Sequence, residues 1–318
     1  MRFGVIIICV LFGLISCKKD EIPIPKHEAG EGQVSQIPMG EDYANQLFYD
    51  LETNSVISTN DKTDWDLGFE SNDDGWHVVL NTSKGMGVHR SDLAFDQITS
   101  DVGLDWHWDK QTGNLDSTAI GDWTNVDKTY VIDLGYNSAG THLGFKKLMI
   151  NDYTASTFTI EVGDLTSVIA QEMIVTKDDN TSFTYFSFND GVVDIAPSKD
   201  SWDLMFTQYT HLFNDPATIY VVTGVLLNRF ETQAALIEDK SFELVDYNDA
   251  VSANYSSNLN YIGYNWKTYD YDNAVYIVDP NKIYIVKTFA GIYYKMHFID
   301  FYNDSGIKGY PTFEVVQL

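Results

Sequence analysis

The chain has 318 residues, of which 44% are hydrophobic and 14% aromatic, so it holds enough apolar material for a sizeable core. Its length predicts two domains of ordinary size. The formal net charge of −26 argues against a basic patch for nucleic acid, because so acidic a surface repels phosphate backbones and anionic headgroups. The acidic residues are spread through loops such as 71–75 and 177–180, which is typical of a solubilising surface.

The N-terminus predicts an export signal. Arg2 precedes the apolar run FGVIIICVLFGLI at 3–15, which is too short to span a bilayer as a stable helix. The run ends in LISC, which resembles the lipobox of bacterial lipoproteins, where the cysteine is lipidated and begins the mature chain. We therefore expect a signal peptide at 1–16 and an acylated Cys17. An ordinary signal peptide with an incidental cysteine is the alternative, and no disulfide is expected because Cys9 lies inside the removed run.

A polar tether is predicted after the cysteine. Residues 17–38 combine proline, glycine and charge with little apolar periodicity, and a flexible chain of this length spans roughly 25 Å. The residues KKDE at 18–21 resemble the surface-export signal of some Gram-negative lipoproteins. We expect an outer-membrane protein that is held by its lipid anchor alone and faces the cell surface.

The remaining chain predicts strands. Apolar or alternating runs of strand length are separated by Gly, Asn, Asp and Pro, and they lie at 183–188, 217–227, 274–278, 282–289 and 293–302. The best helical candidate, 231–244, is short. The predicted fold class is all-β, with antiparallel hairpins.

An internal repeat organises these strands. The word Trp-Asp-Leu-x-Phe occurs at 65–69 and again at 202–206, and an aromatic strand and a Val/Ile strand precede both copies. Further along, three blocks match in the same order: 128–134 with 282–288, 145–153 with 294–302 without a gap, and 157–162 with 312–316. The pattern predicts two tandem β-units, at 40–165 and 183–318.

Strand alternation suggests a role for the repeated word. Trp65, Leu67 and Phe69 are expected on one core-facing side, and the second copy should repeat that face. Asp66 and Asp203 are expected at the rim, where they accept hydrogen bonds from turns. The alternative, a cation site or a catalytic role, lacks partner carboxylates at a fixed spacing.

The second unit resembles a known family. The stretches FSFNDGVVDI…SWDLMFT at 186–207 and NKIYIVKTFAGIYYKMHFIDFYNDSGIKGYPTFEVV at 281–316 are similar to the haem-binding lipoprotein family called HmuY. The resemblance implies an all-β fold and capture of haem or a related porphyrin outside the cell, with an outer-membrane importer as partner. The first unit resembles the family as a diverged copy.

The resemblance also directs attention to iron ligands. In the best-known branch of the family two histidines hold the iron, and one of them follows a tryptophan by a few residues. That tryptophan is Trp266 here, and the matching position is Tyr271; the region 230–262 contains neither His nor Met. Tyrosinate can bind haem iron, so the resemblance implies Tyr271 or Tyr269 as a ligand. Packing and hydrogen bonding is the other interpretation of these tyrosines.

If the first unit holds the ligand instead, four side chains are candidates: His107, between two tryptophans in DWHWD, Met86, His77 and His89. The haem propionates are anions, and the nearest cations to the relevant segments of the chain are Lys267 and Arg229.

Catalytic and metal motifs are absent from the sequence. It has no His-Glu-x-x-His, no Gly-x-Ser-x-Gly, no third glycine in KGMGVHR, no zinc-binding cysteine pairs and no complete EF-hand loop. We therefore expect a protein that is not an enzyme. A different function for the same fold is a surface interaction module, which binds a glycan or a transporter partner.

Overall fold

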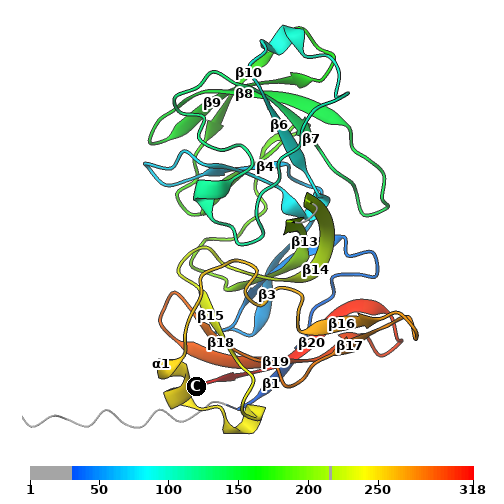
Figure 1. Cartoon of the computed structure of the whole chain (residues 1–318). Coiled ribbons are helices and arrows are strands. Elements are labelled where there is room, and N and C mark those ends of the chain that lie inside the picture. The colour runs from blue at the N-terminus through cyan, green and yellow to red at the C-terminus, as the bar shows by residue number, and fades with distance from the viewer. Residues whose placement is uncertain (1–30, 215–216) are drawn as a thin grey trace, which may run out of the picture.

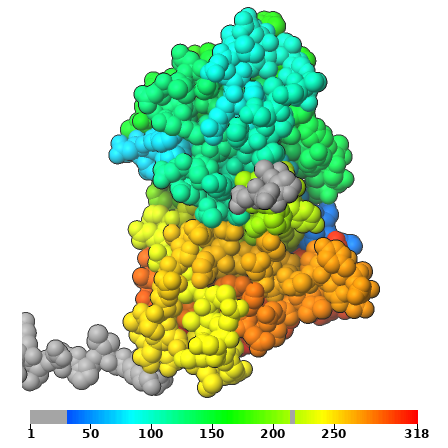
Figure 2. All heavy atoms as spheres, in the orientation of Figure 1, coloured from blue at the N-terminus to red at the C-terminus, as the bar shows by residue number. Residues whose placement is uncertain are grey.

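The computed structural model describes residues 31–214 and 217–318, so the predicted signal peptide, Cys17 and most of the predicted tether lie outside the described residues. Figures 1 and 2 show two lobes, an upper one coloured mainly cyan to green and a lower one mainly yellow to red. Within the described residues, no helix is long and apolar enough to cross a membrane.

The upper lobe contains two antiparallel sheets. One has the order β10-β9-β8-β7-β6 and consists of β6 (Gly87–Ser91), β7 (Thr129–Asp133), β8 (Phe145–Tyr153), β9 (Thr157–Asp164) and β10 (Gln171–Thr176). The other has the order β12-β11-β4-β5 and consists of β4 (Leu67–Glu70), β5 (Val78–Leu80), β11 (Phe183–Ser187) and β12 (Gly191–Val193). Buried side chains from both sheets form one hydrophobic core.

The lower lobe repeats this plan. Its five-stranded sheet, β1-β20-β19-β18-β15, consists of β1 (Gln33–Gln36), β15 (Gln233–Ile237), β18 (Ile283–Lys287), β19 (Tyr293–Tyr302) and β20 (Lys308–Gln317). Its four-stranded sheet, β14-β13-β2-β3, consists of β2 (Asn45–Asp50), β3 (Ser55–Asp61), β13 (Leu204–Asn214) and β14 (Ala217–Leu227). A separate hairpin joins β16 (Lys267–Asp270) to β17 (Val275–Val278).

In the described part of the chain, helical structure is confined to short segments: α1 (Tyr247–Ser252), η1 (Thr82–Lys84), η2 (Phe95–Gln97), η3 (Leu115–Ser117) and η4 (Phe242–Leu244). The prediction of an all-β, antiparallel fold is confirmed. The segment proposed as the best helix instead contains strand β15 and the single turn η4.

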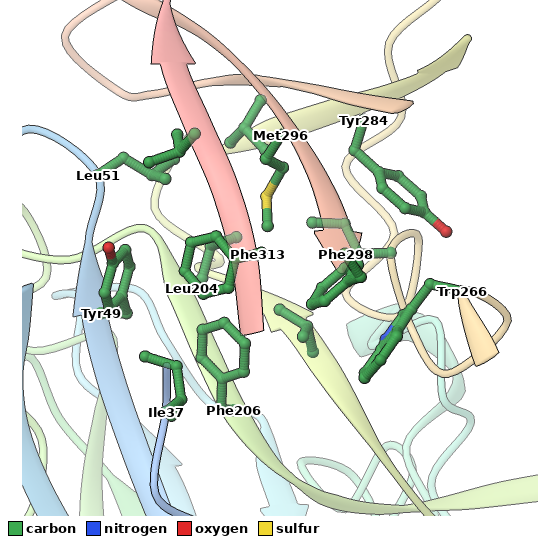
Figure 3. Packing of buried hydrophobic residues seen from close by; sticks show 14 of the residues in the cluster. Ile37, Tyr49, Leu51, Leu204, Phe206, Trp266, Tyr284, Met296, Phe298 and Phe313 are labelled. Atoms are coloured by element: carbon green, nitrogen blue, oxygen red, sulfur yellow. The ribbon is translucent and has the colours of Figure 1, made fainter. Parts of the chain in front are cut away.

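The two sequence repeats exchange their first hairpins. Hairpin β2–β3 precedes the first Trp-Asp-Leu word, yet it pairs with β13, which carries the second word. Hairpin β11–β12 precedes the second word, yet it pairs with β4, which carries the first. Figure 3 shows the result in the lower core, where Tyr49 and Leu51 lie close to Leu204, Phe206 and Phe313. Each core is therefore built from both repeats.

The repeated word binds the exchanged hairpin. Trp65 packs edge-on against Tyr185 of β11, with ring centroids 4.8 Å apart, and Trp202 packs in the same way against Phe48 of β2 at 4.9 Å. The prediction that the tryptophans share the core face is therefore wrong, because both rings lie outside the main clusters. The leucines and phenylalanines of both words do lie in those clusters, as predicted.

Asp66 and Asp203 are buried, with exposed fractions of 6% and 3%, so their predicted place at the rim is wrong. The hydrogen bonds expected of them are present. The N–H of Phe188 donates to Asp66 Oδ2 at 2.7 Å, and the N–H of Leu51 donates to Asp203 Oδ2 at 3.0 Å. Each aspartate therefore holds the end of the hairpin that the other repeat supplies.

Strand register corrects the gapless match of 145–153 with 294–302. Lys147 lies opposite Val131, and Lys295 lies opposite Ile285, so these two lysines are the equivalent pair. Bulges follow Ile150 and Phe298 at the same point of each strand.

The equivalent lysines perform the same structural task. Lys147 Nζ donates to the carbonyl oxygens of Phe95 and Ile98 at 2.6 and 2.8 Å, around η2. Lys295 Nζ donates to those of Phe242 and Val245 at 2.7 and 2.9 Å, around η4. The repeat thus extends to buried polar contacts, which supports a common origin of both lobes.

Candidate functional site

The upper-lobe candidates are not brought together into one site. Met86 is 1% exposed inside the upper core, so its thioether is not presented to a surface ligand. His107 is exposed, but Asp105 lies between it and His89: Asp105 Oδ2 is 3.4 Å from His107 Nε2, and Oδ1 is 2.7 Å from His89 Nδ1. His77 is paired with Glu70 at 2.6 Å. Among the described residues, no three His, Cys, Asp or Glu side chains are arranged to hold a metal ion.

Tyr269 and Tyr271 lie together on the β16–β17 hairpin. Tyr271 is 87% exposed and Tyr269 is 37% exposed, and their rings meet edge-on at 5.1 Å. Tyr269 also contacts Tyr276 of β17, with ring centroids 4.9 Å apart. The two predicted ligands are therefore surface groups with accessible rings.

This hairpin lies beside β19 in the lower lobe (Figure 1). An isolated bridge joins Val225 of β14 to Gly263, just before the hairpin, and Lys267 Nζ donates to the carbonyl oxygen of Thr223. The hairpin is thus fixed to β14 at its base, while its tyrosines remain at the surface.

Lys267 is not available for propionates. Its Nζ lies 4.2 Å from the ring centroid of Trp266 and 4.8 Å from that of Phe301, and the side chain is buried beneath the hairpin. Burial lowers the pKa of Lys267 to about 7. Arg229, the other cation considered, lies at a cavity between the lobes and does not contact these tyrosines.

His211 is not among the ligand candidates that the sequence suggested. It lies on β13 directly opposite Tyr220 of β14, and its ring meets Phe213 at 4.7 Å and Tyr264 at 5.4 Å. Its Nδ1 is buried without a partner, and no side chain or backbone group of the described residues bonds to its ring. Burial lowers the pKa of His211, so the neutral imidazole, which is the form that binds metals, prevails at neutral pH.

Two groups of rings lie on these elements, and together we call them the aromatic face: His211, Phe213, Tyr220 and Tyr264 around β13 and β14, and Tyr269, Tyr271 and Tyr276 on the β16–β17 hairpin. Cross-strand partners project to the same side of a sheet, which places Tyr220 beside His211. Tyr220 is also close enough to Tyr276 that it raises the pKa of that phenol, second to burial. The side chains of Tyr220 and Phe213 are 65% and 47% exposed, so their rings are accessible to a planar apolar ligand.

Two larger grooves suit haem less well. One of about 640 Å³ in the upper lobe is lined by four aspartates, Asp64, Asp66, Asp190 and Asp194, which would repel propionates. Lys84 and Lys146 also line it, but each is already paired with an aspartate. One of about 340 Å³ between the lobes contains lysines, but Lys84 is paired with Asp66 and Lys62 donates to Gln208.

The fold is that of an all-β, two-lobed protein, and its lower lobe exposes the rings of Tyr220 and Tyr271. The chain belongs to the HmuY family: the model described as "HmuY protein" matches residues 42–182 and again 179–315. Each matched segment contains one of the exchanged hairpins. Each of the two segments that match the family model therefore contributes strands to both lobes.

Solved structures with the same family name are similar over most of the chain. An apo HmuY analogue from Tannerella forsythia is 12% identical, covers 92% of this chain and 100% of its own, and gives a TM-score of 0.35. A Bacteroides vulgatus protein described as HmuY-like and haem-binding is 13% identical, with coverages of 89% and 90% and a TM-score of 0.25. Comparison with curated protein sequences gives no match.

Proposed function

We propose that this protein is exported, anchored by lipid at the cell surface, and binds haem or a related porphyrin on the aromatic face for transfer to an outer-membrane importer. Membership of the HmuY family supports the ligand class. The lipobox-like LISC and the export signal in the sequence support the location. The proposed role is binding without catalysis.

The observation that carries the proposal is the unpartnered ring of His211. Histidine that binds a metal must be neutral and must offer a nitrogen lone pair, and burial favours the neutral form here. Because Nδ1 is enclosed by the protein, Nε2 would be the nitrogen that binds. The flanking rings of Phe213, Tyr220 and Tyr264 supply an apolar surface for the porphyrin. His211 would hold the haem iron through its imidazole.

Tyr271 is the proposed second ligand. Its phenol is freely exposed at the end of a chain of ring contacts that runs through Tyr269 to Tyr276. Tyrosinate binds ferric iron, and loss of the phenol proton would accompany binding. With Lys267 buried, the propionates would point into water, which the acidic surface favours.

Titration of purified mature protein with ferric haem tests this function. A saturable Soret shift below about 50 µM is expected, since that range reveals micromolar dissociation constants. His211→Ala should abolish most of the shift, Tyr271→Phe should change the ligand-field bands, and His107→Ala should leave both unchanged. No saturable shift in the wild type would refute haem binding.

The alternative function is a surface interaction module of the same fold, which binds a glycan or a transporter partner. The observation in its favour is the exposure of Tyr220 and Tyr271, because exposed tyrosines often dominate binding interfaces. Loss of a co-purifying importer on Tyr271→Ala, together with no response to haem, would select this function.

A further inference from the structure

A small cavity lies where the two lobes meet. Its volume is about 90 Å³, and both lobes and both sequence repeats line it: Leu80, Asp109, Phe183 and Tyr185 on one side, Met205, Tyr209 and Arg229 on the other. A porphyrin is far too large for this space, so the cavity is separate from the aromatic face.

Arg229 presents unused hydrogen-bond donors to the cavity. Its guanidinium lies over the ring of Phe183, with Cζ 5.2 Å from the centroid, and Nη1 donates to the carbonyl oxygen of Gly113. Within the described residues, this is its only hydrogen bond, and no carboxylate there lies within ion-pair distance. A guanidinium has five N–H donors in a planar fork, so most of them are free.

The one carboxylate that lines the cavity is already occupied. Asp109 Oδ2 accepts the N–H of Leu80 at 2.8 Å, and Oδ1 accepts the N–H of Ala119 at 2.6 Å. Burial raises the pKa of Asp109, while its two backbone hydrogen bonds lower it. Asp109 attracts Arg229 through space, but it does not contact the guanidinium or satisfy its donors.

Two phenols add to the excess of donors. The Tyr185 hydroxyl makes no hydrogen bond within the described part of the chain, and burial raises its pKa to about 12, so it remains a donor at neutral pH. The Tyr209 hydroxyl is buried without a partner. A buried donor without an acceptor, such as the Tyr209 hydroxyl, costs free energy, and a bound acceptor within its reach would relieve that cost.

We propose that this cavity binds a small oxyanion of the carboxylate or phosphate class, held by the Arg229 fork and the Tyr185 hydroxyl. The cavity volume of about 90 Å³ suits an anion of a few heavy atoms. Paired oxygen atoms match the guanidinium fork, and charge-assisted bonds of this kind are the strong ones. Because both lobes supply the walls, the anion would fasten one lobe to the other.

Calorimetric titration of the mature protein with formate, acetate and inorganic phosphate, together with thermal unfolding, tests the site. We expect saturable binding of at least one anion and a melting temperature that rises with its concentration, since a ligand that binds only the folded state stabilises it. Tyr185→Phe keeps the ring that packs on Trp65 and removes one donor, so binding should weaken roughly threefold to tenfold.

Arg229→Gln should abolish binding, and Lys128→Gln, at an exposed lysine paired with Asp92, should leave it unchanged. If Arg229→Gln fails to fold, Tyr185→Phe still decides the matter. No heat and no thermal shift with any of the three anions would overturn the proposal, as would equal binding by Tyr185→Phe and the wild type. A selenate soak with density only from water in the cavity would overturn it as well.

Discussion

Asp203 accepts the backbone N–H of Leu51, although 152 positions separate the two residues in the chain. The same contact occurs in the other lobe between Asp66 and Phe188, so the exchange of hairpins is reciprocal.

The surroundings of the two aspartates differ in one respect. Asn81 and Asn228 are equivalent, because each bonds the carbonyl oxygen of its own word's tryptophan, but the residue three positions later is Lys84 in one repeat and Glu231 in the other. Asp66 consequently has a cation and Asp203 has none.

Folding stability should depend on pH through Asp203. Burial, and then Asp50 and Glu52, raise its pKa from 3.8 to about 7. The folded state therefore keeps a proton that the unfolded chain releases. The stabilising contribution of Asp203 is fully present below about pH 4 and is lost as the pH rises towards 7. At about 1.4 kcal/mol per unit, the upper limit of the loss is about 4 kcal/mol.

Urea unfolding at acidic and neutral pH measures this effect. Asp203→Asn mimics the protonated carboxyl and keeps an acceptor for Leu51, so it should flatten the pH dependence and stabilise the protein at neutral pH. Equal pH slopes in the wild type and Asp203→Asn would contradict the assignment.

The buried Lys84–Asp66 pair should lose stability when only one of its two members is replaced. Lys84→Met leaves Asp66 without a partner in the interior, and removal of one member of a buried pair costs about 3–5 kcal/mol. The double variant Lys84→Met/Asp66→Asn should recover most of this loss, because the uncompensated charge is gone. Chemical unfolding of the four proteins gives the coupling energy, and a value near zero would show that the pair is not buried in solution.

Haem binding, if it uses His211, should persist to mildly acidic pH. Burial lowers the pKa of His211 from 6.5, so protons compete with iron only below the usual range of histidine. Soret titrations over a pH series should give a midpoint of binding below 6.5. Phe213→Ser, which exposes the imidazole to water, should move that midpoint upward; an unchanged midpoint would place the ligand elsewhere.

The exchanged hairpins predict that the two halves depend on each other. A fragment of residues 31–182 lacks β11–β12, and a fragment of residues 183–318 lacks β1, β2 and β3, so each would expose part of a core. We expect the separate fragments to aggregate or to unfold, and an equimolar mixture to recover the native circular dichroism and elute as one complex. Two folded, monomeric fragments that ignore each other would show that each hairpin can return to its own repeat.

Local patterns in the sequence were sufficient for the strand content and the repeat. Alternation marks Leu204 and Phe206 as core residues, and the structure confirms this. The exchange was not predictable, because Tyr49 and Phe186 occupy matching positions and either aromatic strand fits either word. Pairing between repeats depends on chain geometry at 62–66 and 194–203, which side-chain periodicity does not encode.

The site was harder to predict than the fold. His211 looks like any residue of an alternating strand, and its significance comes from Tyr264, which is 53 positions away in sequence. Met86 was a candidate ligand of the first unit, but its side chain packs inside the upper core. The sequence held one weak indication of the site. Tyrosines are frequent at 261–276, and the strand that carries His211 contains no other histidine.

Strand β1 lies against β20, so the first and last strands of the chain share one edge of the lower sheet. If the chain is tethered through its N-terminus, its first and last strands would both lie in the lobe nearest the tether. Tension on the tether would then pull β1 lengthwise against β20, and all four paired positions would resist together. The upper lobe would project outward as the tip, mechanically sheltered from that load.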